Sequence, residues 1–113
     1  MFYKHNLCGY HSAVPGVTLK TLVHGDKTLF TEFRLQGGHT LPRHAHEQEQ
    51  TGYLVSGHIR LSIGGETFNV GPGDSWCIPG GMEHGAEIIE DSVAIEVFAP
   101  VREDYLTFCG LTE

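Results

Sequence analysis

The chain has 113 residues, of which 40% are hydrophobic and 19% are charged, as in an ordinary globular protein. We expect one domain that spans residues 1–113. The net charge of −7 and the lack of a Lys/Arg cluster argue against nucleic acid and anionic membrane surfaces as partners. No apolar run approaches the roughly 20 residues of a membrane span. The first residues also lack the apolar segment of a signal peptide, so we expect a cytoplasmic protein.

Strand signals follow one another along most of the chain. Side chains alternate in the predicted strands 17–23, 29–35, 53–56, 58–63, 66–70, 75–78 and 92–98. The pair Gly64 and Gly65 predicts a two-residue hairpin, and residues 71–74 (GPGD) predict another turn. A short helix is expected only at 101–109 (VREDYLTFC). Short, evenly spaced strands with glycine and proline turns predict an all-β sandwich or barrel.

Cysteine usage argues against covalent or thiolate-based structure. The chain has three cysteines, Cys8, Cys77 and Cys109, and they are widely spaced. An odd number without a C-x-x-C pair predicts neither a disulfide framework nor a thiolate zinc site. We therefore expect reduced cysteines that pack as small apolar side chains.

Histidine is unusually frequent, and two of the eight histidines stand in the stretch RHAHEQEQ. On an extended strand His44 and His46 point to the same side, because side chains alternate with a period of two. If the strand continues straight, Gln48 and Gln50 share that side, whereas Glu47 and Glu49 point away. The alternation therefore favours an amide over an acid as the third group, unless a turn after His46 changes the direction of the chain.

A metal site also needs a ligand from a distant part of the chain. The best candidate is His84 in PGGMEHG, because the turn before it can direct a side chain into a barrel. The remaining histidines stand in turns or near the N-terminus and are expected to be solvated. They are His5, His11, His24, His39 and His58.

Two stretches resemble the motifs of the cupin superfamily. Residues 38–57 follow G-x5-H-x-H-x3-E-x6-G, except that Gln50 stands at the glutamate position. Residues 73–84 follow G-x5-P-x-G-x2-H, and Ile88 stands where an Asn usually comes after it. The resemblance implies a cupin double-stranded β-helix, a jelly-roll barrel that holds one divalent metal ion.

The tail EVFAPVREDYL at 96–106 narrows the resemblance to KdgF-type cupins of pectin degradation. That resemblance implies a metal-dependent isomerase of carbohydrate metabolism, which converts 4,5-unsaturated galacturonate into a linear keto sugar acid. The metal ligands that it implies are His44, His46, Gln50 and His84. The implied catalytic residues are Glu96, Phe98 and Arg102, although the family usually has Asp at the first of these positions.

These residue types suit the implied chemistry. Three histidines and a glutamine are neutral, so a bound ion keeps its full charge and favours Lewis-acid work; zinc, nickel, manganese and iron(II) are all compatible. Arg102 offers a fork for a substrate carboxylate, and Glu96 can act as a general acid or base. Glu96 and Phe98 share one side of strand 92–98. The alternatives are a solvent-facing Glu96, an Arg102 paired with a neighbouring surface acid, and a Phe98 that only fills the core.

Two other functions fit the same motifs. One is a metal-dependent dioxygenase cupin of the quercetinase-like kind, and the other is a non-catalytic sensor that binds a small molecule. A homodimer is expected from the resemblance, since cupins commonly pair, and the apolar stretch 1–10 (MFYKHNLCGY) offers a surface for the second copy. The expected ligand is a small anionic sugar acid.

Overall fold

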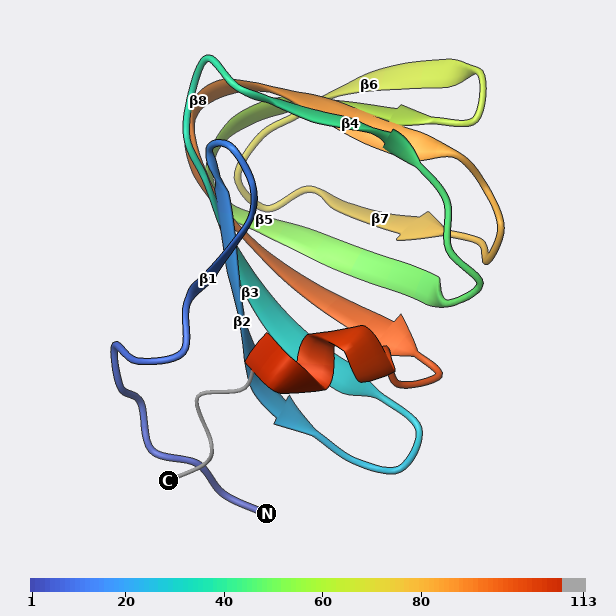
Figure 1. The fold of residues 1–113 in the computed structure, drawn as a ribbon. Coiled ribbons are helices and arrows are strands. Elements are labelled where there is room, and N and C mark those ends of the chain that lie inside the picture. The colour runs from blue at the N-terminus through green and yellow to red at the C-terminus, as the bar shows by residue number, and fades with distance from the viewer. Residues whose placement is uncertain (109–113) are drawn as a thin grey trace.

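A computed structural model describes residues 1–108 of the chain and shows an all-β fold with one short 3₁₀ helix (Figure 1). The strands are β1 (His11–Val14), β2 (Val17–His24), β3 (Leu29–Leu35), β4 (Thr40–His44), β5 (Glu49–Ile63), β6 (Glu66–Val70), β7 (Ser75–Ile78) and β8 (His84–Ala99), and the helix is η1 (Glu103–Phe108). The helices of this part of the chain are too short to cross a membrane.

The two long strands β5 and β8 organise the fold. They pair antiparallel from Glu49 opposite Ala99 to Ile63 opposite His84. The first half of β5 and the second half of β8 form one layer with β1, β2, β3 and β7, and the other halves form a second layer with β4 and β6. Figure 1 shows these layers facing each other, with β4 and β6 above and β2, β3 and η1 below. This is the jelly-roll barrel that the sequence predicts.

The bend that separates the layers lies at Gly57. Its φ of 99° lies in the region that favours glycine, and the β5–β8 register shifts on both sides of it. A Cβ at this position would overlap with Oγ of Ser92 on the neighbouring strand. Ser92 Oγ in turn accepts a hydrogen bond from the backbone N of His58 at 3.0 Å. Both long strands therefore turn together, and each contributes to two layers.

The core lies between the layers and follows the alternation of side chains along the strands. On β8, for example, Ala94, Glu96 and Phe98 are buried, while Val93, Ile95 and Val97 on the outer side are half-buried. The apolar members of the core are Val17, Leu19, Leu29, Phe33, Leu35, Leu54, Ile59, Leu61, Val70, Ala86, Ile88, Ala94 and Phe98. The inner faces of both layers are therefore filled mostly by side chains of strands predicted from alternation, and Ala86 and Ile88 come from the part of β8 that was not predicted.

Several predicted elements agree with the structure, and others are extended by pairing. The strands 29–35, 66–70 and 75–78 have the predicted bounds. The predicted pieces 53–56 and 58–63 belong to one strand that begins at Glu49, and β8 begins at His84 rather than at 92. Its added segment carries charged residues on the outer face, so its sequence looks like a loop. Strands β1 and β4 were not predicted, because their sequences, HSAV and TLPRH, are mostly exposed and show no regular apolar alternation, and β4 contains a proline.

The expectation of packed cysteines is wrong for the two that the structure describes. Cys8 and Cys77 are free thiols, as predicted, but both are exposed. Cys77 lies on β7 between the inward-facing Trp76 and Ile78, so the alternation of the strand turns it outward. Cys109 lies outside the described residues. The helix expected at 101–109 is observed as the 3₁₀ helix η1, from Glu103 to Phe108.

Candidate metal centre

Three histidines meet at one end of the barrel. His44 ends β4, His84 begins β8, and the two residues are directly opposite each other in the β4–β8 pair. His46 follows in the short segment between β4 and β5. One nitrogen from each ring lies within 4.8 Å of the other two, which is close enough for all three to bind one ion. The structure thus brings together three of the predicted ligands.

Each of these rings is held by a backbone carbonyl on its Nδ1 side. The partner carbonyls belong to Pro42, Gln48 and Met82, at 2.8, 3.1 and 2.9 Å from the Nδ1 atoms of His44, His46 and His84. A carbonyl accepts only from N–H, so each neutral ring carries its proton on Nδ1 and has a lone pair on Nε2. Histidines that bind metals in proteins are commonly oriented in this way.

The Nε2 atoms have the environment that a metal ligand needs. His84 Nε2 is buried and has no hydrogen-bond partner within the part of the chain that the structure describes. Burial lowers the pKa of His84 to about 4 and also lowers the pKa of His46, so both rings are neutral at pH 7. His46 Nε2 and Gln50 Oε1 lie 3.0 Å apart, and with the proton on Nδ1 each presents a lone pair. A cation between these atoms satisfies both, so the residues fit a divalent metal.

Gln50 is the fourth predicted ligand, and it lies beside the histidines. It is the second residue of β5 and is only 6% exposed. The chain leaves the strand conformation between β4 and β5, yet the alternation of burial continues, and Glu47 and Glu49 are exposed. The amide and not a neighbouring acid therefore faces the three rings.

Glu96 lies behind Gln50, inside the barrel and not on the solvent face. Its side chain is 7% exposed, and its carboxylate accepts hydrogen bonds from Gln50 Nε2 and from Trp76 Nε1, the latter at 3.2 Å. Burial raises the pKa of Glu96 to about 7, although both hydrogen bonds act in the opposite direction. Trp76 was not predicted as a site residue, because it occupies a variable position of the second motif. The sequence distinguishes it only as the single tryptophan of the chain.

Phe98 lies beside His46, and Arg102 lies over Phe98. Phe98 is 1% exposed, and its ring centroid is 5.6 Å from that of His46 and 5.3 Å from that of Tyr105. The guanidinium of Arg102 lies over both Phe98 and Tyr105, at 5.2 and 3.8 Å from the ring centroids. Arg102 also forms a two-point ion pair with Asp104, as the surface alternative predicted, although its own side chain is only 14% exposed. Tyr105, which contacts both Phe98 and Arg102, is a second residue of this region that the sequence did not single out.

The prediction of solvated positions for the other histidines agrees with the structure for three of the five. His5, His11 and His24 are exposed, and His39 and His58 are half-buried. Among the described residues, none of them joins a cluster with ligand spacing.

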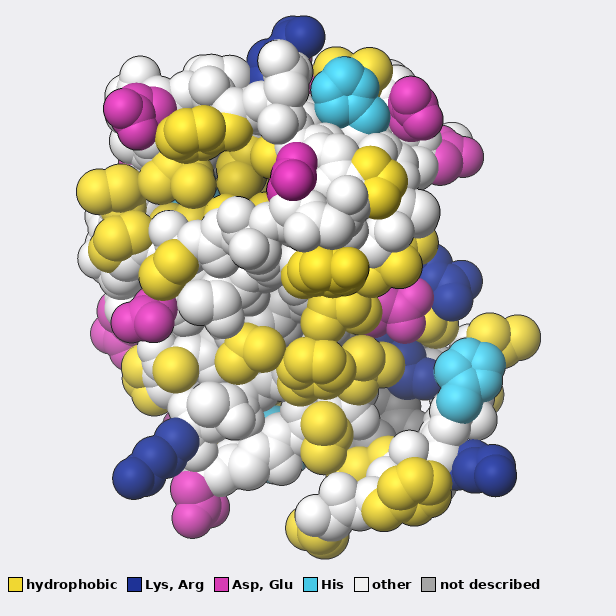
Figure 2. All heavy atoms as spheres, turned by 180° about the vertical axis from the view of Figure 1, so that it is seen from behind, with side chains coloured by type: hydrophobic (Ala, Val, Ile, Leu, Met, Phe, Trp, Pro, Cys, Tyr) yellow, Lys and Arg dark blue, Asp and Glu magenta, His cyan; other side chains and the backbone are white. Residues whose placement is uncertain are grey.

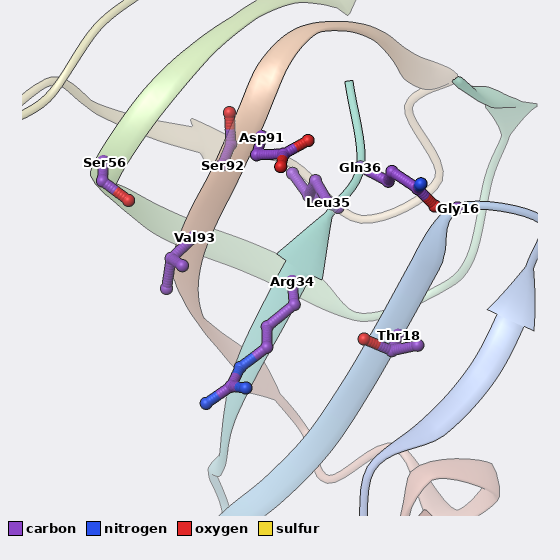
Figure 3. Close-up of a pocket in the computed structure, with 9 residues that line it drawn as sticks. All are labelled: Gly16, Thr18, Arg34, Leu35, Gln36, Ser56, Asp91, Ser92 and Val93. Atoms are coloured by element: carbon purple, nitrogen blue, oxygen red, sulfur yellow. The ribbon is translucent and has the colours of Figure 1, made fainter. Parts of the chain in front are cut away.

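The cavity at the metal centre differs in size and position from the larger grooves on the surface. A groove of about 550 Å³ runs over the outside of the bend, and Figure 3 shows the Arg34 side chain in it extending away from Asp91 and Ser92. A much smaller cavity of about 30 Å³ lies inside the barrel, and Gln50, His84 and Glu96 all line it. That volume suits one water molecule and not a sugar. A larger molecule would therefore have to reach the centre from the side on which His44 and His46 are partly exposed.

The family model described as "Cupin domain" matches residues 31–99, which include all four predicted ligands. The chain belongs to the cupin superfamily. KdgF from Halomonas sp. is 31% identical over 84% of this chain and 90% of that one, with a TM-score of 0.80. An RmlC-like cupin from Shewanella frigidimarina is 25% identical, over 85% of this chain and 86% of that one, with a TM-score of 0.81.

Two further cupins show how widely this barrel is used. Oxalate decarboxylase OxdC of Bacillus subtilis is 29% identical over 80 residues, which are 66% of this chain but only 21% of that protein. The chain therefore spans about a fifth of the length of this curated relative. A salicylate 1,2-dioxygenase from Pseudaminobacter salicylatoxidans shares the fold, with a TM-score of 0.74 at 14% identity, over 77% of this chain and 27% of that one.

Substituting His46 tests the metal centre. We expect His46→Ala to raise the dissociation constant for zinc by more than about a hundredfold, since loss of a ligand exceeds the 10–100-fold effect typical of an outer partner. Zinc retained after desalting is measured by elemental analysis. The matched control is His58→Ala, which removes a half-buried histidine outside the cluster and should leave the zinc content unchanged. Equal zinc content in all three proteins would contradict the assignment.

Proposed function

We propose that this cupin is a metal-dependent isomerase that converts 4,5-unsaturated uronates, the products of pectin and alginate breakdown, into linear keto uronates. The similarity to KdgF, at 31% identity over most of both chains, supports this proposal. So does the tail EVFAPVREDYL, which resembles that of KdgF-type cupins. The observation that carries it is the neutral donor set of three histidines with Gln50 beside them.

The donor set bears on the kind of reaction. A divalent ion held by His44, His46, His84 and Gln50 would supply a Lewis acid that polarises a substrate oxygen. The proposed conversion suits such a site because it is an isomerisation without a co-reactant. The hemiacetal hydroxyl loses a proton, and the bond between the anomeric carbon and the ring oxygen breaks. The ring oxygen leaves as an enolate, which takes one proton on carbon and becomes a ketone, so one proton is lost and one is gained and the electrons balance.

Arg102 is the proposed anchor for the substrate carboxylate. Asp104 occupies the Nε and Nη2 edge of its guanidinium, and Tyr105 Oη accepts from Nη1 at 3.0 Å. One N–H on each of the two terminal nitrogens is not used by these bonds. A substrate carboxylate would meet Arg102 at that end, while Asp104 and the ring of Tyr105 hold the guanidinium in place.

Glu96 is the proposed proton-transfer residue, and Phe98 supports the ligand His46. The carboxylate of Glu96 lies against the inner cavity of about 30 Å³, from which one water can pass a proton toward the site. Phe98 is fully buried, so its role is to hold the ring of His46 by an edge contact. Glu96 stands where KdgF-type cupins usually have Asp, and its carboxylate contacts Gln50.

The reaction can be followed directly. Purified protein reconstituted with zinc, nickel, manganese or iron(II) should remove the ultraviolet absorbance of 4,5-unsaturated galacturonate faster than the spontaneous reaction. His46→Ala should show only the spontaneous rate, whereas His58→Ala should match the wild type.

The outcomes separate this function from the alternatives. No acceleration with any of the four metals would contradict an isomerase. Oxygen consumption with a phenolic or diketone substrate would instead indicate a dioxygenase. Tight binding of a uronate without turnover would indicate a non-catalytic sensor.

Arg102→Lys tests the anchor. Lysine keeps the charge but loses the planar fork, so we expect KM for the unsaturated uronate to rise by about tenfold or more. Zinc content should stay at the wild-type level, because Arg102 is not a ligand. Steady-state kinetics on the reconstituted enzyme measures the change. An unaltered KM would remove Arg102 from the substrate site.

A second copy of the chain is the proposed protein partner. The outer face of β3, β8 and β5 carries the exposed side chains of Phe30, Tyr53 and Val55, at 38%, 49% and 46%. Ile95, on the same face of β8, lies directly opposite Tyr53 in the β5–β8 pair. Figure 2 shows hydrophobic side chains gathered along the middle of the face opposite to that of Figure 1. In a two-fold symmetric dimer, residues near the symmetry axis contact the same residues of the second copy. The outward-facing side chains of β8, Val93, Ile95 and Val97, are uncharged, so such contacts involve no charge repulsion.

A charge on this face should prevent the pairing. We expect the wild type to be a dimer at micromolar concentration and Tyr53→Lys to be a monomer, by size exclusion with light scattering. Phe68→Lys is the matched control, since Phe68 is 44% exposed on β6, in the other layer. A monomeric wild type, or a dimeric Tyr53→Lys, would contradict this interface.

A further inference from the structure

A row of side chains crosses the inner face of the first layer behind the metal centre. Trp76 on β7 lies opposite Gly52 on β5, and Gly52 lies opposite Glu96 on β8. Thr31 on β3 continues the row, and its hydroxyl donates to the backbone carbonyl of Glu96 at 2.8 Å. Gln50 stands two residues before Gly52 and points the same way. The row therefore connects the core of the barrel to one of the four candidate ligands.

Gly52 makes room for this arrangement. A Cβ at Gly52 would overlap with the ring of Trp76, so the indole lies flat over the backbone of β5. In that position its Nε1–H reaches Glu96 Oε1 at 3.2 Å. Because Gly52 has no side chain, Trp76 of β7 and Glu96 of β8 can form a hydrogen bond across β5.

The carboxylate of Glu96 determines which end of the Gln50 amide faces the histidines. Both donors, Trp76 Nε1 and Gln50 Nε2, reach the same oxygen of Glu96. An amide has donors at one end and an acceptor at the other, and a carboxylate only accepts. The nitrogen end of Gln50 is therefore held at Glu96, and its oxygen end faces His46 Nε2, at 3.0 Å. That is the end with which a glutamine binds a metal.

We infer that Glu96, with Trp76 behind it, positions the amide oxygen of Gln50 toward the three histidines, and that the emission of Trp76 reports metal binding there. Glu96 acts here through Gln50 and is a positioning residue. The inference rests on metal binding at the histidines and not on the uronate reaction. A metal bound to the amide oxygen of Gln50 withdraws electron density from the amide, so its N–H group becomes a stronger hydrogen-bond donor to Glu96. The hydrogen bond from Trp76 to the same carboxylate oxygen changes as a result.

The experiment uses full-length protein freed of metal and titrated with zinc alone. The dissociation constant is measured by competition with a chromophoric chelator, and Trp76 emission is recorded in the same titration. Trp76 is the single tryptophan, so the emission has one source. We expect a saturable change in wild-type emission at one zinc per chain. Unchanged emission at saturation would overturn the reporter role.

Three substitutions separate positioning from general stability. Glu96→Leu leaves Gln50 without an acceptor, and we expect about 10–100-fold weaker zinc binding and no emission change at saturation. Glu96→Gln keeps an acceptor oxygen and should bind zinc with nearly the wild-type dissociation constant. Thr31→Val is the matched control, because it alters the same row without touching Gln50, and it should bind like the wild type.

Several results would overturn the proposal. Wild-type zinc affinity in folded Glu96→Leu would show that the amide needs no support. Equal weakening in Glu96→Gln would show that charge, and not the direction of the amide, is what Glu96 supplies. If Glu96→Leu does not fold, Trp76→Phe gives the answer. It removes one of the two bonds to Glu96 and should weaken zinc binding by about two- to tenfold, and unchanged binding would contradict the proposal. Because uronate is absent throughout, failure of the isomerase assay leaves these outcomes unaffected.

Discussion

The antiparallel pairing of β5 with β8 is the constraint on which the rest of the molecule depends. It sets Gln50 opposite Phe98 and Gly52 opposite Glu96 in one layer, and it brings His84 to the end of the other. A shift of one residue would turn every one of these side chains to the opposite face. Gly57 lets both strands bend together, so a single ladder supplies the core of two layers and the interior side of the metal centre.

The interior of this barrel holds several buried polar side chains, among them Gln50, His84 and Glu96, and most of their polar atoms are hydrogen-bonded. The ring protons of the three histidines go to backbone carbonyls, and the donors of Gln50 and Trp76 go to Glu96. Buried polar groups without partners are costly, so such pairing is needed for stability. The lone pairs that face the centre take no part in this pairing. Among the described residues His84 Nε2 is the buried side-chain atom without a hydrogen-bond partner. Stability and metal binding therefore depend on the same set of contacts.

The comparisons show one barrel used for different chemistry. KdgF, an oxalate decarboxylase and a salicylate dioxygenase all resemble this chain in fold or sequence, so the fold does not decide the reaction. The side chains around the ion carry that information. With an amide at position 50, held from behind by an acid on β8, the proposed ligand set is neutral and a carboxylate stays nearby. In this arrangement an acid that is not a ligand is available to support the ligand or to handle protons.

Alternation and motif spacing are local properties, so they were enough to predict the all-β fold, most of the strands and the three histidines that cluster in the structure. The sequence also favoured Gln50 over Glu47 and Glu49, although the strand that the argument assumed is interrupted there. The contact of Glu96 with Gln50, and that of Trp76 with Glu96 over Gly52, could not be predicted in this way. These contacts arise from strands that are far apart in the chain. Their register is set by pairing and by the bend of the barrel, which no local pattern records.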